Sequence, residues 1–167
     1  MRKVYCINCD DLVDYTVSKV HKTIEVGDVQ VDAEIKEARC INCGELLFVD
    51  EIEGYNDIVV YDEYKKKMGL LTSNEIKEIR KKRNMTQKDL ANFLGIGEKD
   101  ITRYENGSIQ TKSIDRFIRA VGNDYCYKSL FKTWTLLDEE ALRTHVAGGI
   151  EKNKKSSKAI KSKIKKN

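Results

Sequence analysis

The 167-residue sequence lacks the features that define membrane or secreted proteins. No apolar run approaches the roughly 18 residues that a membrane-spanning helix needs. The first eight residues, MRKVYCIN, lack the apolar segment of a secretory signal. We therefore expect a cytoplasmic protein without a membrane partner.

Motifs that would indicate a reaction are also missing. The sequence has no P-loop, and Gly95-Ile96-Gly97 lacks the third glycine of a dinucleotide-binding loop and joins two predicted helices. The acidic pairs Asp10-Asp11 and Glu139-Glu140 have no nucleophile or histidine at a useful spacing. We therefore expect that the protein is not an enzyme.

Histidine is scarce and proline is absent, but there are five cysteines. A cytoplasmic protein keeps its thiols reduced, so these cysteines indicate metal or redox chemistry rather than a disulfide framework. His21 and His145 have no partner at ligand spacing, and we interpret both as structural or exposed. Cys126 stands alone and is interpreted as a small buried apolar residue.

The other four cysteines form two pairs with identical intervening residues, Cys6-Ile7-Asn8-Cys9 and Cys40-Ile41-Asn42-Cys43. Each CxxC turn presents two sulfur atoms on one side, and two turns complete the tetrahedral shell that Zn²⁺ prefers. Gly44 supplies the permissive φ that such a turn often needs, and Asp10 fills the equivalent place after the first pair. The spacing predicts a structural Zn²⁺ site with the ligands Cys6, Cys9, Cys40 and Cys43.

Iron held by four cysteines uses similar spacing, so the choice between zinc and iron stays open. A redox dithiol is disfavoured, because neither pair precedes a helical pattern in a βαβ setting. The module is too small to build a good core alone, and a four-thiolate site contributes about 10–16 kcal/mol of apparent binding free energy to folding. We therefore predict that chelation unfolds residues 1–50.

A β-hairpin is predicted between the two pairs. Apolar residues alternate with polar ones from 29 to 35, which is typical of a half-buried strand. Residues 15–26 alternate less regularly, with a phase change near Ser18-Lys19, and Gly27-Asp28 is a natural tight turn. Residues 46–49 predict another short strand, so the module is zinc-ribbon-like.

Helical patterns follow the second pair. Apolar residues recur at helical spacing from 58 to 68, which predicts a helix that starts behind Asn56-Asp57 and ends at Gly69. Thr72-Ser73-Asn74-Glu75 resembles a capping box that opens a new helix. We therefore predict an α+β protein with three parts: a zinc module at 1–69, an all-α domain at 70–137, and a C-terminal extension at 138–167.

The all-α domain contains a pair of short helices joined by a glycine-rich turn. Thr86-Gln87-Lys88-Asp89 is a second capping box, Gly95-Ile96-Gly97 interrupts the helical pattern, and a helix over 98–106 ends at Gly107. Beside the basic cluster at 80–83, this arrangement is typical of a helix-turn-helix whose second helix enters a DNA major groove.

The segments 85–91, 94–97 and 101–107 resemble the Xre/Cro-type repressor pattern. Together with the two CxxC pairs, residues 1–121 resemble the MqsA (YgiT-type) zinc-finger and helix-turn-helix antitoxins. The resemblance implies a homodimer, formed through the helical domain, that binds double-stranded DNA at a palindromic operator. It also implies autoregulation of the operon, a protein toxin bound by the zinc module, and a bacterial protein that is nucleoid-associated when bound to DNA.

The same resemblance implies which residues contact DNA. Arg103 matches the recognition-helix arginine that reads bases, and its guanidinium can bond to guanine O6 and N7. Lys99 matches a position that often holds asparagine, so the base pair it reads stays open. Gln87 and Lys88, at the amino end of the preceding helix, match phosphate contacts. With two residues at the exposed edge of the second helix, the predicted set is Gln87, Lys88, Lys99, Thr102, Arg103 and Asn106.

Charge is distributed unevenly along the chain. The net charge is −6 over residues 1–70, +3 over 71–150 and +7 over 151–167. An acidic module suited to a protein partner thus precedes a basic domain suited to DNA.

Apolar residues from 127 to 137 predict a further helix, as a dimer contact or a cap on the bundle. The lysine-rich segment 152–167 is predicted to be disordered and to add salt-dependent DNA affinity.

Two other interpretations stay open. The chain is alternatively a stand-alone Xre-family regulator of a mobile element or phage, with a zinc module that serves only as a structural platform. A less favoured alternative is an interaction scaffold that does not bind DNA. Co-expression with the product of a neighbouring reading frame separates the first alternative from an antitoxin, and an operator shift assay tests the second.

Overall fold

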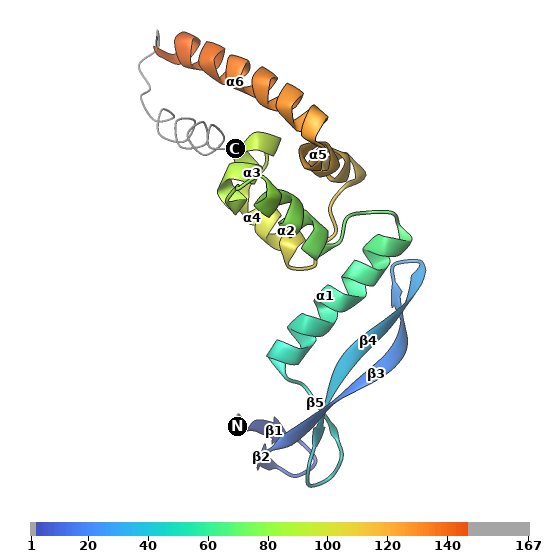
Figure 1. The fold of residues 1–167 in the computed structure, drawn as a ribbon. Coiled ribbons are helices and arrows are strands. Elements are labelled where there is room, and N and C mark those ends of the chain that lie inside the picture. Colours follow the sequence, from blue (N-terminus) through green and yellow to red (C-terminus); the bar gives the residue numbers. More distant parts are fainter. Residues whose placement is uncertain (1–2, 147–167) are drawn as a thin grey trace. The chain divides into compact units, whose positions relative to one another are not determined.

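The computed structural model describes residues 3–146, and the side chains of residues 3–136 (Figure 1). The architecture is α+β, with antiparallel strands and four close cysteines in the N-terminal part and six helices after them, as predicted. Contacts divide the chain into two units, of which the first contains the chain up to Ser73 together with Asn106–Ile109. The second contains Asn74–Glu105 and the chain from Gln110 onward. The limits predicted for the three parts stay a prediction, and the segment predicted to be disordered lies outside the described residues.

The strands of the first unit form two antiparallel sheets. They are β1 (Val4–Cys6) paired with β2 (Asp11–Val13), and β3 (Tyr15–Val26), β4 (Val29–Cys40) and β5 (Leu46–Leu47) in that order. Gly27, with φ of +60°, and Asp28 form the two-residue turn between β3 and β4, which confirms the predicted hairpin. β3 is continuous through Ser18-Lys19, where the sequence suggested a phase change. β1 and β2 were not predicted, because three residues are too few for a periodic pattern to show.

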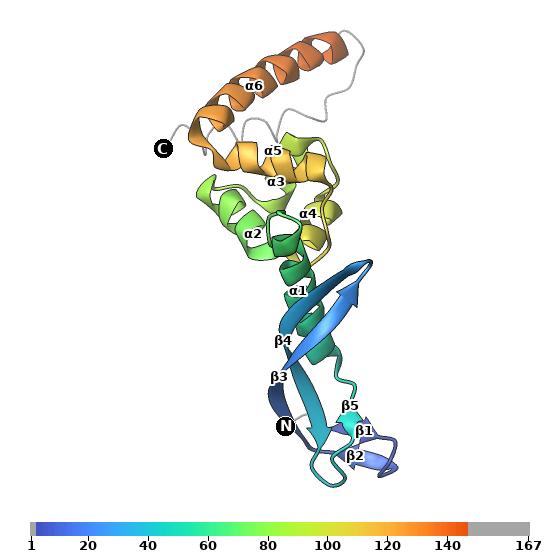
Figure 2. The same cartoon turned by 90° about the vertical axis from the view of Figure 1, so that its right-hand side faces the viewer.

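Helix α1 (Asp50–Lys67) lies along the hairpin, as both views show (Figures 1 and 2). The alternating face of β4 is buried against it, with Val31, Ala33 and Ile35 packed around Val60. The helix starts at Asp50 rather than behind Asn56-Asp57 as predicted. The acidic residues of its first turn favour the positive end of the helix dipole, and the apolar periodicity used for the prediction misses this signal.

A second apolar cluster surrounds the cysteines at the other end of the first unit. It is centred on Cys6 and Cys40, and its other buried members are Val13, Ala38, Leu47, Val49 and Ile52. β1, β2 and β5 all contribute to this cluster. The middle of β4 instead packs on α1, in the cluster around Val60. The first unit therefore has two cores, one beside the cysteines and one beside α1.

Most of the second unit is a bundle of short helices. They are α2 (Ser73–Lys82), α3 (Gln87–Leu94), α4 (Glu98–Glu105), α5 (Lys112–Gly122) and α6 (Asp124–Val146). Thr86 caps α3 with the reciprocal hydrogen bonds of a capping box, as predicted. Gly95 ends α3 in the left-handed conformation with φ of +70°. Leu90, Ile101 and Val121 are fully buried at the centre of the bundle.

The apolar helix predicted over 127–137 is confirmed as part of α6. Its aromatic residues cover α3, because the ring of Phe93 lies 5.8 Å from that of Tyr127 and 5.7 Å from that of Trp134. These contacts favour the predicted role of a cap on the bundle, and the dimer contact stays a prediction. Within residues 3–146, every helix is too short or too polar to cross a lipid bilayer.

Candidate metal centre and candidate nucleic-acid interface

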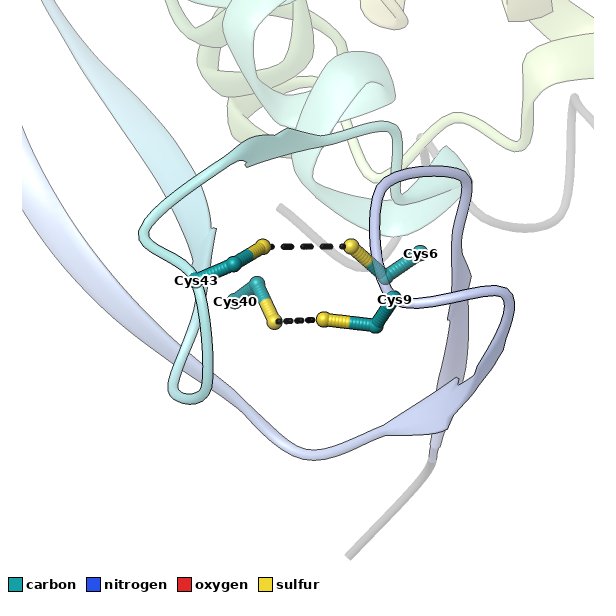
Figure 3. A group of neighbouring side chains, drawn as sticks. All are labelled: Cys6, Cys9, Cys40 and Cys43. Atoms are coloured by element: carbon teal, nitrogen blue, oxygen red, sulfur yellow. Dashed lines mark hydrogen bonds between the residues drawn. The ribbon is translucent and has the colours of Figure 1, made fainter.

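The four predicted ligand cysteines converge at one end of the first unit (Figure 3). Cys6 ends β1 and Cys9 lies in the turn to β2, whereas Cys40 ends β4 and Cys43 lies in the turn to β5. Their sulfur atoms all lie within 4.8 Å of one another. Across the two turns, Cys6 Sγ lies 3.5 Å from Cys43 Sγ, and Cys9 Sγ lies 3.8 Å from Cys40 Sγ. The cysteines form no disulfide.

This geometry fits a tetrahedral metal ion. A zinc–sulfur bond of about 2.3 Å in a regular tetrahedron separates neighbouring sulfur atoms by about 3.8 Å. Both cross-turn distances match this separation. Four thiols without a disulfide also form the donor set that soft ions prefer. Cys6, Cys9, Cys40 and Cys43 are therefore able to hold a metal ion, which would join the two turns.

The backbone after the second pair has the conformation predicted for Gly44, and Asp10 adopts the same conformation after the first pair. Asp10 has φ of +53° and Gly44 has φ of +76°, so the residue after each pair is left-handed. In the second turn, the Gly44 N–H donates to the Cys40 carbonyl at 2.9 Å, and the Asn42 N–H points to Cys40 Sγ at 3.4 Å. The Gly44 hydrogen bond closes the turn, and the Asn42 N–H helps to orient the sulfur atom of Cys40.

The thiols differ in acidity. A side-chain hydrogen bond from Asn8, followed by the backbone N–H of Glu45, lowers the pKa of Cys43 to about 6. A hydrogen bond with Cys43, followed by burial and the other thiols, raises the pKa of Cys9 to about 12. Neighbouring thiols therefore oppose complete ionisation of the cluster. A bound cation supplies the charge that allows all four to act as thiolates.

Charged residues behind the second turn hold it in place. The Arg39 guanidinium donates to the Gly44 carbonyl at 3.2 Å and to the Glu37 carboxylate at 2.8 Å. The Glu37 side chain is only 7% exposed and also pairs with Lys22 at 2.5 Å. The hydrogen bond from Lys22, followed by that from Arg39, lowers the pKa of Glu37. Sequence patterns did not reveal this support, because a glutamate in a predicted strand is expected to be exposed.

The predicted DNA-contact residues lie on and beside α3 and α4. Residues 95–97 separate these helices, and the helices pack against each other. Lys88, Lys99 and Arg103 are exposed, whereas Gln87 and Thr102 are half-buried and joined by a hydrogen bond of 3.0 Å. These five residues belong to the second unit. Asn106 is exposed directly after the last residue of α4 and groups with the first unit.

The inner side of α4 is fixed by a buried carboxylate. Glu105 accepts hydrogen bonds from the Arg80 guanidinium and, at 2.9 Å, from the Gln87 side-chain amide. Arg80 also donates to the Met85 carbonyl at 2.9 Å. The three helices that carry Arg80, Gln87 and Glu105 are thus joined at one point. Sequence reasoning missed this network because its members are distant in the chain.

The basic cluster at 80–83 is therefore largely structural. Besides Arg80, the Arg83 side chain is only 11% exposed and pairs with Asp124 at 2.7 Å. Its guanidinium also lies 4.4 Å from the ring centroid of Tyr127 and donates to the Val121 carbonyl at 2.7 Å. Arg83, directly after α2, thus contacts the end of α5 and the start of α6, while Lys81 and Lys82 stay exposed.

Comparison with known protein families identifies the chain. A family model described as "Antitoxin component of bacterial toxin-antitoxin system, MqsA" matches residues 1–119. The chain belongs to the MqsA antitoxin family. The match spans both the four-cysteine cluster and the α3–α4 pair, which confirms the resemblance inferred from the sequence. No curated protein and no solved structure matches the chain significantly.

Proposed function

We propose that this MqsA-family chain is a dual-purpose antitoxin, which binds a protein toxin and represses its own operon by binding the operator as a homodimer. The proposed DNA reader is the α3–α4 pair, acting as an Xre-type helix-turn-helix. The proposed metal is a structural Zn²⁺ ion held by the four cysteines. No catalytic step is assigned to the chain.

The observation that carries the DNA-binding proposal is the two-sided character of α4. Its inner side contains the fully buried Ile101 and the anchored Glu105, and its outer side presents Lys99 and Arg103 to solvent. An α-helix with its side chains is about 10–12 Å in diameter, which fits a major groove about 12 Å wide. Arg103 is placed to read guanine, and Lys99 to contact a base or a phosphate.

Gln87 and Lys88 contribute differently to the proposed complex. Gln87 uses its amide nitrogen on Glu105 and its amide oxygen on Thr102. Its main proposed role is therefore to orient α4. Lys88 is exposed at the start of α3 and supplies the phosphate contact.

The proposed toxin site is on the first unit. Residues 1–70 have a net charge of −6, which disfavours contact with DNA and favours a basic protein partner. The metal ion stabilises the fold that presents this surface, and it does not itself touch the partner in this proposal. Antitoxin and repressor functions are thus assigned to separate units.

The experiment that tests the DNA proposal is a binding assay with the DNA upstream of the chain's own reading frame. Arg103→Ala is expected to weaken binding to that DNA by about 1–3 kcal/mol while leaving binding to scrambled DNA nearly unchanged. Arg116→Ala is the matched control, because Arg116 is an exposed arginine on α5. Equal losses on both DNAs would show that Arg103 contacts phosphate, and no binding by the wild-type chain would refute the repressor function.

Co-expression tests the toxin proposal. The protein encoded beside this chain is expected to arrest growth when produced alone and to be neutralised when both are produced together. A footprint on the upstream DNA with two half-sites one helical turn apart would support the homodimer. A chain that binds this DNA but neutralises no neighbour would instead be a stand-alone regulator.

A further inference from the structure

An apolar groove lies beside the four-cysteine cluster and is not needed to hold a metal ion. It has a volume of about 560 Å³ and lies between the first cysteine turn and the segment that follows the second. We name it the knuckle groove, and its accessible lining is Tyr5, Ile7, Asn8, Glu45, Leu46 and Phe48. Ile7 is 86% exposed and Phe48 is 71% exposed. Such exposure of large apolar side chains around one groove is typical of a protein-binding surface.

Phe48 is the central feature of this surface. Its side chain lines the knuckle groove and also a second hollow, of about 380 Å³, whose lining includes Asp50 and Glu51 at the start of α1. The side chain therefore stands as a ridge between two depressions. An exposed aromatic ridge that enters a partner is the usual form of an interface anchor.

Strand edges border the knuckle groove on both sides. Among the described strands, β1 is hydrogen-bonded to β2 alone, and β5 is hydrogen-bonded to β4 alone. β1 and β5 contact each other without forming one sheet. Tyr5 and Leu12 are opposite each other in the β1–β2 pair and are both more than half exposed, which extends the apolar surface beyond the groove.

Charge narrows the choice of partner. Glu45 lines the knuckle groove, and Asp50 and Glu51 line the adjoining hollow, where Lys3 is the only basic residue among those that the structure describes. DNA and anionic lipid are disfavoured by this acidic border. A second copy of the same unit would bring like charges together. The complementary partner is a basic protein surface with an apolar side chain.

We infer that the knuckle groove and Phe48 form the docking surface for the basic toxin. This inference rests on the proposed antitoxin function and specifies where the toxin binds. The apolar side chains supply the buried area, and the acidic border selects a basic partner and speeds its association.

The test is calorimetric titration of the full-length chain with the purified protein encoded beside it. Phe48→Asp and, separately, Ile7→Asp are expected to weaken binding at least tenfold. Phe117→Asp changes an exposed phenylalanine of the second unit, and Val17→Asp changes an exposed residue of β3 that does not line the groove. Both controls are expected to change the affinity less than about twofold. Unchanged metal content and binding to operator DNA show that each variant is folded.

The outcomes separate the docking surface from the antitoxin function. Wild-type affinity of both groove variants would refute the docking surface and leave the antitoxin function intact. Loss of binding in Val17→Asp alone would place the toxin on β3 and would also refute the docking surface. A wild-type chain that does not bind its neighbour would refute both proposals. A change from dimer to monomer in Phe48→Asp would show that the groove joins two copies, which contradicts the inference.

Discussion

Arg80 and Glu105 form a two-point ion pair between α2 and α4. The guanidinium Nε donates to Oε1 at 2.5 Å, and Nη2 donates to Oε2 at 2.9 Å. The Glu105 side chain is only 3% exposed, and the Gln87 amide satisfies it further. Arg103 is two residues before Glu105 on α4, so the ion pair also holds in place the part of the helix that carries the proposed base-reading side chain.

Acidification is expected to weaken this anchor. Burial raises the pKa of Glu105, but the hydrogen bonds from Arg80 and Gln87 outweigh it, so the pKa lies below its ordinary value of 4.5. The resulting stabilisation is present above about pH 4.5 and is lost as the pH falls through the lower folded-state pKa. We expect Glu105→Gln to lower the free energy of unfolding by about 1.5–3 kcal/mol at neutral pH. At a pH below the folded-state pKa of Glu105, the substitution is expected to lower it by less.

The fluorescence of Trp134 reports unfolding of the bundle, because Trp134 is the only tryptophan of the chain and contacts Phe93 in this bundle. Urea unfolding followed by its fluorescence at several pH values measures the difference. Glu98→Gln is the control, since Glu98 is an exposed residue of the same helix. A constant difference between Glu105→Gln and wild type across the acid range would contradict the assigned role.

Asp100 is expected to oppose DNA binding. Its carboxylate lies 3.5 Å from the Arg103 guanidinium; the Arg103 side chain is 67% exposed and that of Asp100 is 40% exposed, so the pair contributes little stability. Arg103 must leave Asp100 to bond to a base, and the carboxylate repels nearby phosphates. Asp100→Asn is therefore expected to raise operator affinity by about 0.5–1 kcal/mol, which corresponds to a few-fold change.

The matched control for this prediction is Asp57→Asn. It removes the same charge from an exposed position on α1. If both variants bind the operator equally tightly, the gain reflects net charge alone and the specific role of Asp100 is wrong. Measurement at two salt concentrations gives an independent check, because general electrostatic effects diminish at high salt.

The elements predicted well from the sequence are those that local chemistry determines. Gly27-Asp28 forms the hairpin turn and Thr86 forms the capping box, because both need only neighbouring residues. The two cysteine turns have a spacing that few other sites share. The contacts of Arg80 and Gln87 with Glu105 were not predicted, because Glu105 follows them by 25 and 18 residues in the chain. Only the fold shows that these polar residues face inward.

Asn56 also makes a contact between residues that are distant in the chain. Removal of its side chain is expected to loosen the hairpin. Its side-chain oxygen accepts from the Lys36 N–H and its amide donates to the Lys36 carbonyl, both at 2.8 Å. The buried amide thus replaces a neighbouring strand at this point of β4. Asn56→Ala is expected to cost about 1–3 kcal/mol and to speed hydrogen exchange of the Lys36 amide. Asn74→Ala, at an exposed asparagine, should leave that exchange rate unchanged.

Metal removal is expected to affect the two cores of the first unit differently. The core around Cys6 and Cys40 depends on the joined cysteine turns, whereas Val31 and Val60 belong to a core that is held by α1. Chelation should therefore speed amide exchange in β1, β2 and β5 first, and less in the centre of β4. The sequence predicts that chelation unfolds residues 1–50 as a whole. We now expect the loss of structure to be largest around the four cysteines.

Hydrogen exchange of the full-length chain, with and without a strong chelator, measures this difference, and elemental analysis identifies the metal. Cys43→Ser should reproduce the effect of the chelator, because three thiolates bind zinc less tightly than four. Cys126→Ser is the control, since Cys126 lies on α6 outside the cluster. Uniform exchange throughout residues 3–49 after chelation would show that the core beside α1 also depends on the metal. An exchange pattern and thermal profile unchanged by the chelator would show that the four cysteines hold no stabilising ion.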